Sequence, residues 1–254
     1  MINKKNRDNY YTIYGVNNCI NFLRSKKRFE SVKISINKQG NAAKNNKLIN
    51  LIDRTGFNIS FLDNKQYNSK FQFKHDQGII IQFKGQLIKN LMDGIENFKK
   101  ETCLIICDQI NDPQNLGQIF RTCECAGIDG IILPKHSSVH ITNSVIQVSQ
   151  GAIFHLNIFI ETNLNNTIKF LKSNDFWVIG IENSIKAKNW YEMDYKGKIA
   201  IVLGSEGKGI RPLVKRSCDF LATIPMRGEI SSLNVSAALS AIIFERERQL
   251  QSSK

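Results

Sequence analysis

Three segments in the second half of the chain carry polar side chains whose types and spacing could do chemistry. NDPQNLGQIFRTCECAG contains Asn115 and Arg121, VLGSEGKGI contains Glu206, and IPMRGEISSLNVSAA contains Ser232 and Asn234. Amides, a hydroxyl, a carboxylate and a guanidinium can orient a substrate and stabilise charge that develops on it. The residue types therefore indicate a site for group transfer or ligand binding.

Each polar residue also has an ordinary structural interpretation. Asn115 could cap a helix, and Ser232 and Asn234 are good N-cap residues for the helix after them. Arg121 follows Asn115 by six residues, under two helical turns, so it could face the same cleft or lie on the surface. With Ser231, three polar groups lie at that one helix start, which nevertheless exceeds what a cap requires.

The glycines of the second segment narrow the chemistry. Gly204, Gly207 and Gly209 follow an apolar run and would let the backbone approach a ligand closely. Their spacing fits neither the phosphate loop GxxxxGK[ST] nor the dinucleotide fingerprint GxGxxG. An NAD-type oxidoreductase is therefore disfavoured.

The elements that must position these segments form a βα alternation after residue 102. Apolar runs predict strands at 103–107, 129–133, 155–160, 176–181, 199–203 and 220–224, and helical patterns occupy 116–126, 163–173, 210–216 and 233–249. Continuous apolar strands between amphipathic helices predict an α/β fold, a mostly parallel sheet with helices on both faces. Such sheets bind ligands at the carboxyl ends of their strands, where all three segments begin.

The first part of the chain predicts a separate, smaller α/β unit. Helical patterns at 16–23 and 48–56 alternate with strand patterns at 31–36, 58–62 and 78–83. We expect a basic N-terminal domain over 1–85, a linker over 86–101 and a second domain over 102–254.

The charge is divided between these parts. The chain has a formal net charge of +13; residues 1–100 hold 19 Lys and Arg against 7 Asp and Glu, and the remainder is nearly neutral. An excess that stops near residue 100 indicates a part that binds a polyanion, although a Lys- and Asn-rich exposed surface would give a similar count.

No apolar run is long enough for a membrane span and the start has no secretory pattern, so we expect a cytoplasmic protein without membrane contact. The six cysteines include no CxxC pair, which predicts reduced thiols and no metal site.

Together the three segments resemble the motifs of the SpoU (TrmH-like) class of SPOUT RNA 2′-O-ribose methyltransferases, in the same order. The resemblance is close over residues 101–248, and VSQGAIFHLNI at 148–158 is also similar to the family. IYGVNNCINFL and HDQGIII resemble, more loosely, the RNA-binding domain of the 23S rRNA guanosine-2′-O-methyltransferase branch. The HQG of that domain stands here as His75-Asp76-Gln77-Gly78, with one residue interposed.

The resemblance implies a C-terminal trefoil knot that binds S-adenosyl-L-methionine, a small N-terminal RNA-binding domain, and a homodimer. By position, the residues that it assigns to the cofactor are Gly204, Ile224 and Leu233. The residues that it assigns to catalysis or substrate handling are Asn115, Arg121, Glu206, Ser232 and Asn234.

In this family the arginine of the first motif is often regarded as a base, yet a guanidinium stays protonated in proteins. We therefore expect Arg121 to bind an RNA phosphate and stabilise the developing alkoxide, while Asn115 and Asn234 orient groups. Glu206 is expected to hold Arg121 or the motif loop.

The substrate that the resemblance implies is structured RNA. A guanosine of 23S rRNA is preferred, since the simplest tRNA enzymes of the class lack a separate basic domain. A tRNA 2′-O-methyltransferase, a resistance-type methyltransferase and a non-catalytic ribosome-assembly factor remain alternatives.

Overall fold

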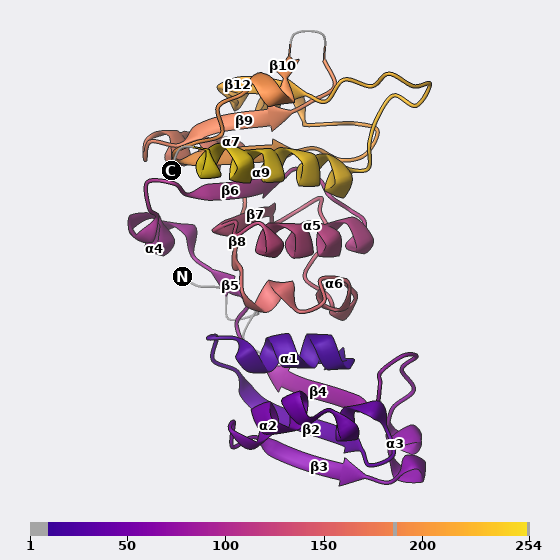
Figure 1. The fold of residues 1–254 in the computed structure, drawn as a ribbon. Helices are drawn as coiled ribbons and strands as arrows, with labels where there is room; N and C mark the ends of the chain where they lie inside the picture. Colours follow the sequence, from indigo (N-terminus) through magenta and orange to yellow (C-terminus); the bar gives the residue numbers. More distant parts are fainter. Residues whose placement is uncertain (1–9, 185–186, 253–254) are drawn as a thin grey trace. The chain divides into compact units, whose positions relative to one another are not determined.

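The computed structural model describes residues 10–184 and 187–252, and the chain divides into two compact units (Figure 1). The N-terminal unit consists of residues 1–87 and 141–155, and the C-terminal unit of residues 88–140 and 156–254. The division differs from the predicted boundaries in two places. Most of the predicted linker belongs to the C-terminal unit, and residues 141–155 belong with the N-terminal one. The charged start, on which the expected lack of a secretory signal rests, lies outside the described residues.

The N-terminal unit is built on a four-stranded mixed sheet in the order β1-β4-β2-β3. Its elements are β1 (Tyr10–Tyr14), α1 (Val16–Arg24), β2 (Glu30–Asn37), α2 (Asn46–Asp53), β3 (Asn58–Leu62), α3 (Asn64–Lys70) and β4 (Ile79–Lys84). Strands β2 and β3 are parallel, and β4 is antiparallel to both of its neighbours. The predicted strands and helices are confirmed, whereas β1 and α3 were not predicted.

Residues 141–155 complete this unit. They form α6 (Asn143–Val148) and a 3₁₀ turn (Ala152–Phe154). The ring of Phe154 packs edge-on against Phe22 of α1, and the Ser25 hydroxyl donates a 2.9 Å hydrogen bond to the Phe154 carbonyl. The segment therefore contributes core and hydrogen bonds to a unit from which it is distant in sequence.

The C-terminal unit holds an eight-stranded sheet in the order β10-β12-β9-β11-β6-β7-β8-β5. Its strands are β5 (Ile88–Lys89), β6 (Cys103–Cys107), β7 (Gly130–Pro134), β8 (Asn157–Glu161), β9 (Trp177–Ile181), β10 (Lys188–Asn189), β11 (Ile199–Leu203) and β12 (Phe220–Thr223). Every pair of neighbours is parallel. The predicted parallel sheet is confirmed.

Helices cover both faces of this sheet. Successive residues of a strand point to opposite faces, so a strand that is apolar throughout needs cover on both. The helices are α4 (Leu91–Gly94), α5 (Pro113–Cys125), α7 (Leu164–Lys172), α8 (Pro212–Ser217) and α9 (Val235–Gln251). Helices α7 and α8 share a core with Leu104 and Val202, while α5 and α9 lie beside each other over another part of the unit (Figure 1). Leu91, from the predicted linker, is buried in the same core as Leu104, which explains why this stretch belongs to the unit. None of the helices in the described residues is long and apolar enough to cross a membrane.

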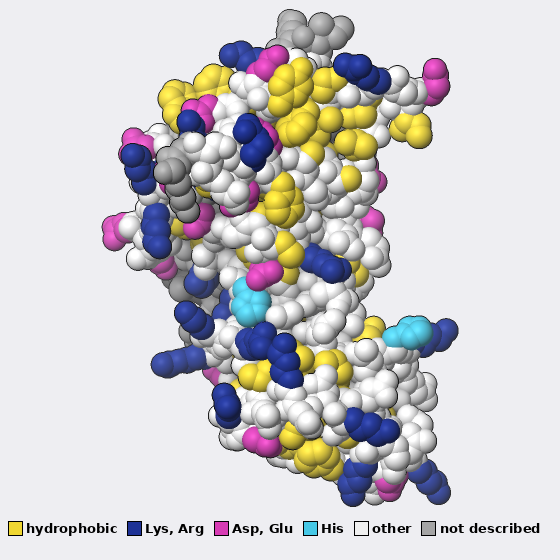
Figure 2. Space-filling view, in the orientation of Figure 1, with side chains coloured by type: hydrophobic (Ala, Val, Ile, Leu, Met, Phe, Trp, Pro, Cys, Tyr) yellow, Lys and Arg dark blue, Asp and Glu magenta, His cyan; other side chains and the backbone are white. Residues whose placement is uncertain are grey.

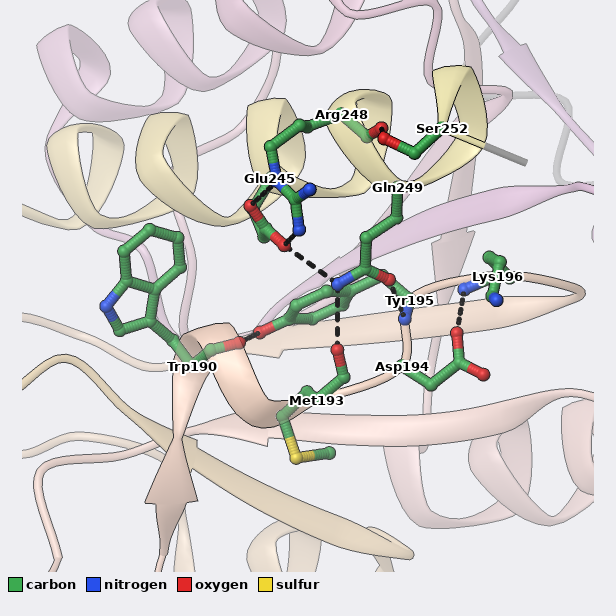
Figure 3. A network of polar contacts seen from close by, with 9 residues as sticks. All are labelled: Trp190, Met193, Asp194, Tyr195, Lys196, Glu245, Arg248, Gln249 and Ser252. Carbon is green, nitrogen blue, oxygen red and sulfur yellow. Dashed lines mark hydrogen bonds and ion pairs between the residues drawn. The ribbon is translucent and has the colours of Figure 1, made fainter. Parts of the chain in front are cut away.

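The segment at 190–196, which precedes β11, is joined to α9 by hydrogen bonds (Figure 3). The Gln249 side chain accepts a 2.9 Å hydrogen bond from the backbone nitrogen of Tyr195 and donates one of 2.9 Å to the Met193 carbonyl. The Tyr195 side chain is fully buried, and its hydroxyl donates to the Trp190 carbonyl at 2.8 Å. Burial raises the pKa of this phenol, so the neutral, donating form persists. The network fixes the C-terminal half of α9, the helix whose start carries Asn234.

Candidate active site

A cavity of about 310 Å³ opens at the carboxyl ends of β9, β11 and β12. Parallel α/β sheets bind ligands at this edge, and the sequence placed two of its three polar segments there. The predicted site residues that line the cavity are Gly204, Glu206, Ile224, Ser232 and Leu233. Two residues that the sequence analysis missed, Glu182 and Asn183, also line it. They follow directly after β9, so the strand-end rule could have found them.

Asn115, Glu206 and Asn234 form one hydrogen-bonded group. The Asn234 amide nitrogen donates to the Asn115 side-chain oxygen at 2.7 Å and to Glu206 Oε1 at 2.8 Å. The Asn115 amide nitrogen donates to the same Glu206 oxygen at 3.1 Å. Each of the three predicted segments supplies one member, so this group, the amide–carboxylate triad, joins all three.

Asn234 is fixed in the triad by a second task. Its side-chain oxygen accepts hydrogen bonds from the backbone nitrogens of Ser236 and Ala237, at 2.9 and 3.4 Å, and so caps α9. The cap uses the oxygen, which leaves the amide nitrogen for Asn115 and Glu206. The capping interpretation is therefore confirmed for Asn234, and the cap does not prevent its amide nitrogen from joining the triad.

Asn115 does not cap a helix. Asp112 caps α5 by accepting from the Gln114 backbone nitrogen at 3.0 Å, with Pro113 at the first helical position. Asn115 lies in the first turn with its side chain 7% exposed. It lines a smaller hollow of about 160 Å³ that shares Glu206 with the larger cavity. The early start of α5 therefore places the Asn115 amide beside the strand ends.

The glycines of the second segment allow the backbone of their own loop to pack closely against itself. A Cβ on Gly204 would lie 2.1 Å from the carbonyl carbon of Gly209, a distance that no side chain tolerates. Ser205 and Gly209 pair through two backbone hydrogen bonds, and Gly207 and Gly209 have φ of 78° and 64°. The expected close approach at Gly204 is thus an approach of backbone to backbone, and it keeps Glu206 at the tip of a tight loop.

An ion pair with a buried carboxylate, which the sequence did not reveal, holds the far end of this loop. Asp108, at the end of β6, is fully buried, and Arg211 lies just before α8. Asp108 Oδ1 accepts a 2.7 Å hydrogen bond from Arg211 Nε and forms an ion pair with Arg211 Nη2, also at 2.7 Å, while Oδ2 accepts from the Arg211 backbone nitrogen at 2.8 Å. Backbone and side-chain contacts from one residue fix orientation as well as distance. Residues 204–210 are therefore held between β11 and this pair.

Arg121 lies apart from the triad. It is exposed on α5, lines neither cavity, and has no hydrogen bond or ion pair with another residue in the described ranges. Six residues of α-helix turn through about 240°, so Arg121 and Asn115 project from different sides of α5. Glu206 accepts from the two amides rather than from Arg121, contrary to one of the two roles expected for it. Arg121 is positioned to meet a ligand that approaches from solvent.

Two cysteines near these loops, Cys107 and Cys218, are held as protonated thiols. Burial raises the pKa of the Cys107 thiol, at the end of β6, to about 12, and that of Cys218 to about 12. A thiol with such a pKa is protonated at neutral pH and unreactive. Among residues 10–184 and 187–252, no group of three His, Cys, Asp or Glu side chains is arranged to hold a metal ion.

Two family models match this chain. Residues 102–244 match the model of the SpoU rRNA methylase family, and residues 12–86 match the model described as RNA 2′-O ribose methyltransferase substrate binding. A 23S rRNA (guanosine-2′-O-)-methyltransferase, RlmB, from Shewanella oneidensis is 38% identical over 199 residues, which cover 78% of this chain and 80% of that one.

Two further similarities concern part of the chain and its fold. A protein of Staphylococcus saprophyticus assigned to the TrmH family of tRNA and rRNA methyltransferases is 44% identical over 146 residues, and the match spans 58% of each chain. The SpoU methyltransferase AviRb from Streptomyces viridochromogenes, crystallised with AdoMet, has a similar fold, with a TM-score of 0.81 and 17% identity. That likeness covers 99% of this chain and 94% of AviRb.

Proposed function

This chain belongs to the SpoU rRNA methylase family, and from that membership we propose that it transfers a methyl group from S-adenosylmethionine to a ribose 2′-hydroxyl of RNA. A guanosine of 23S rRNA is the proposed target. The relative from Shewanella oneidensis carries that activity in its name and aligns with 78% of this chain. The match of residues 12–86 to a substrate-binding model supports an RNA substrate for the N-terminal unit.

The amide–carboxylate triad is the observation that carries the proposal. It joins three segments that are far apart in sequence at the edge of the sheet where ligands bind. Amide and carboxylate groups that hold one another are preorganised, so they can align a reacting group without moving. Alignment is the main requirement for a methyl transfer, because a sulfonium already supplies a good leaving group.

The cavity at the strand ends suits S-adenosylmethionine, a cation with an adenine ring. Its volume lies within the range of small-ligand sites, about 300–1,000 Å³. Ile181, Leu203 and Leu233 offer apolar contact for a ring, and Glu182 and Glu206 offer carboxylates to a cation. The buried Ser205 hydroxyl, on the same wall, has no hydrogen-bond partner in the described residues and can bind a polar group.

The other residues take roles that follow from their exposure. Arg121, exposed and unpaired within the described ranges, binds an RNA phosphate and stabilises the developing alkoxide, while the phosphate or a water accepts the proton. Ser232 and Leu233, exposed beside the cavity, contact the ligands from the loop before α9. A trefoil knot around the strands that end at the cavity, a homodimer and a cytoplasmic location complete the proposal.

The basic N-terminal part supplies the affinity for RNA. Residues 1–100 carry 19 Lys and Arg against 7 Asp and Glu. On the face drawn in Figure 2, Lys and Arg side chains are spread over the N-terminal unit. Phosphate contacts of this kind give binding that weakens as salt rises.

Two measurements test the proposed function. Calorimetry of the full chain with S-adenosylmethionine should show binding at one site per chain, and its absence would sink the assignment. Mapping of 2′-O-methylation across rRNA and tRNA, in a strain that lacks the protein, should show the loss of one methylguanosine in 23S rRNA. Loss from tRNA instead would identify a tRNA enzyme, and cofactor binding without any lost methyl group would favour an assembly factor.

A further inference from the structure

Three sequence segments that the proposed catalysis does not use meet at one cavity in the N-terminal unit. The segments are YGVNN at 14–18, KHDQ at 74–77 and QVSQ at 147–150. A cavity of about 340 Å³ lies between them, and each segment contributes side chains to its wall. Polar side chains dominate this wall, and no Asp or Glu of the described residues lines it. We call it the amide cavity, after the Asn and Gln residues around it.

The walls of the amide cavity are fixed before any ligand binds. Gln77 accepts a 2.7 Å hydrogen bond from the backbone nitrogen of Val16, and Gln147 donates one of 3.0 Å to the carbonyl of Tyr14. His75 and Gln77 have φ of 62° and 58°, in the left-handed region that side chains avoid. Backbone of this kind persists where surrounding structure holds it, and it often occurs at binding sites.

Asn18 leaves a hydrogen-bond acceptor unsatisfied in this wall. Its side chain is 1% exposed, and its amide nitrogen donates to the carbonyls of Tyr14 and Gln147 at 3.3 and 3.4 Å. Its side-chain oxygen has no donor anywhere in the part of the chain that the structure describes. A buried acceptor without a donor is unfavourable, so an N–H or O–H group of a ligand would find a partner there.

The rim offers a lysine, an imidazole and an aromatic surface. Lys74 and His75 are exposed and line the opening. Phe73 is 42% exposed and stacks on Tyr14, with ring centroids 4.8 Å apart and 24° between the planes. Amide groups, a lysine and an exposed stacked ring are what proteins use to hold a splayed-out RNA base and its phosphate.

We propose that the amide cavity binds one unstacked base of single-stranded RNA, with Phe73 as the stacking surface and Lys74 on the adjoining phosphate. The proposal rests on an RNA substrate and assigns the amide cavity to reading a nucleotide other than the one that is methylated. Base edges in duplex RNA are hard for side chains to reach, whereas a base in a loop can enter a cavity of this size. The sequence feature His75-Asp76-Gln77-Gly78 thereby acquires a role in building a binding wall.

The test blocks the amide cavity without changing charge. Asn17 is exposed on α1 and lines the cavity, so Asn17→Trp places a large ring at its mouth. Asn50, exposed on α2 and outside the cavity, gives the matched control Asn50→Trp. Fluorescence anisotropy of the full chain measures binding of labelled oligo(A), oligo(C) and oligo(U) heptaribonucleotides and of an RNA duplex. Lys74→Ala, with Lys47→Ala on α2 as control, repeats the comparison if Asn17→Trp proves unfolded by circular dichroism.

The expected result is that Asn17→Trp weakens binding of at least one heptamer by about tenfold or more, a loss in the range of one stacked base. Asn50→Trp and the duplex should show no such loss. Equal binding by the wild type and Asn17→Trp would overturn the proposal, as would equal losses in both tryptophan variants. Failure of the wild type to bind any heptamer at about 100 µM would overturn it too.

Calorimetry on the same proteins separates this inference from the proposed function. Asn17→Trp should bind S-adenosylmethionine as the wild type does. The amide cavity shares no residue with the cavity at the carboxyl ends of β9, β11 and β12, where the cofactor is proposed to bind. A wild type that binds heptamers but not S-adenosylmethionine would defeat the methyltransferase assignment and leave the amide cavity standing. The opposite pattern would defeat the amide cavity alone.

Discussion

The amide nitrogen of Asn234 lies 2.7 Å from the side-chain oxygen of Asn115, although the two residues are 119 positions apart in the chain. Because the same nitrogen also donates to Glu206, a shift of α9 against α5 would break two hydrogen bonds at once. The triad therefore makes the geometry of the site depend on the packing of those two helices.

Asn234→Ser should lower turnover by about 100-fold, the usual effect of removing a preorganised donor. Serine preserves the cap of α9 but cannot donate to both Asn115 and Glu206. Single-turnover methylation and calorimetry should show a slower step with nearly unchanged affinity for the cofactor. Asn166→Ser, on the exposed side of α7, is the matched control. Unchanged turnover in Asn234→Ser would contradict a functional triad.

Arg121→Ala should reduce turnover by about 100-fold, with Arg121→Lys in between, because a lysine keeps the charge but not the planar fork. Since Arg121 is exposed and has no partner in the described residues, the free energy of unfolding should change by less than about 0.5 kcal/mol. Steady-state kinetics and urea unfolding check both parts. Near-normal turnover by the alanine variant would remove Arg121 from the mechanism.

Arg211→Ala should lower the free energy of unfolding by about 1–3 kcal/mol, because it leaves the buried Asp108 carboxylate with only a backbone donor. It should also weaken binding of S-adenosylmethionine, since the pair holds one end of residues 204–210. Urea unfolding and calorimetry measure the two effects. Arg216→Ala, exposed on α8, should leave both unchanged. Full stability with normal cofactor affinity would show that the pair does not hold the loop.

Stability should fall as pH rises above about 8.5, where thiols of the unfolded chain ionise. Burial raises the pKa of the thiols of Cys19, Cys103, Cys107, Cys123 and Cys218. These groups keep their protons in the folded state, so their contribution is complete below pH 8 and is lost by about 1.4 kcal/mol per pH unit per thiol above 8.5. Urea unfolding at pH 7 and pH 9.5, with reductant present, measures the slope. A chain more stable at pH 9.5 would contradict the burial of the thiols.

The regular elements were readable where apolar periodicity is strong. The runs at 103–107 and 199–203 coincide with β6 and β11, because strands buried on both faces are continuously apolar. Strand β1 and helix α3 were not predicted, because YYTIY and NKQYNSK show little apolar periodicity. Helix α3 depends on a capping box between Asp63 and Gln66, a local hydrogen-bond pattern that apolar spacing does not report.

The proximity of three candidate residues followed from the sequence, whereas their pairings did not. Asn115, Glu206 and Asn234 were expected near one another because each follows a parallel strand, and they meet. Of the two partners expected for Glu206, Arg121 does not contact it, since six helical residues rotate Arg121 away from Asn115. The pairing of Asp108 with Arg211 joins segments 103 residues apart, and no spacing rule predicts which charges meet across a sheet.

The chain passes between its two units after residues 87, 140 and 155, so the N-terminal unit is not a detachable prefix. Removing residues 1–100 would leave Ile146 and Phe154, both buried in that unit, facing water. An RNA-binding assay on that fragment could not then distinguish aggregation from a loss of RNA affinity. Recombination meets the same constraint, because an exchange of the N-terminal unit between relatives needs three breakpoints.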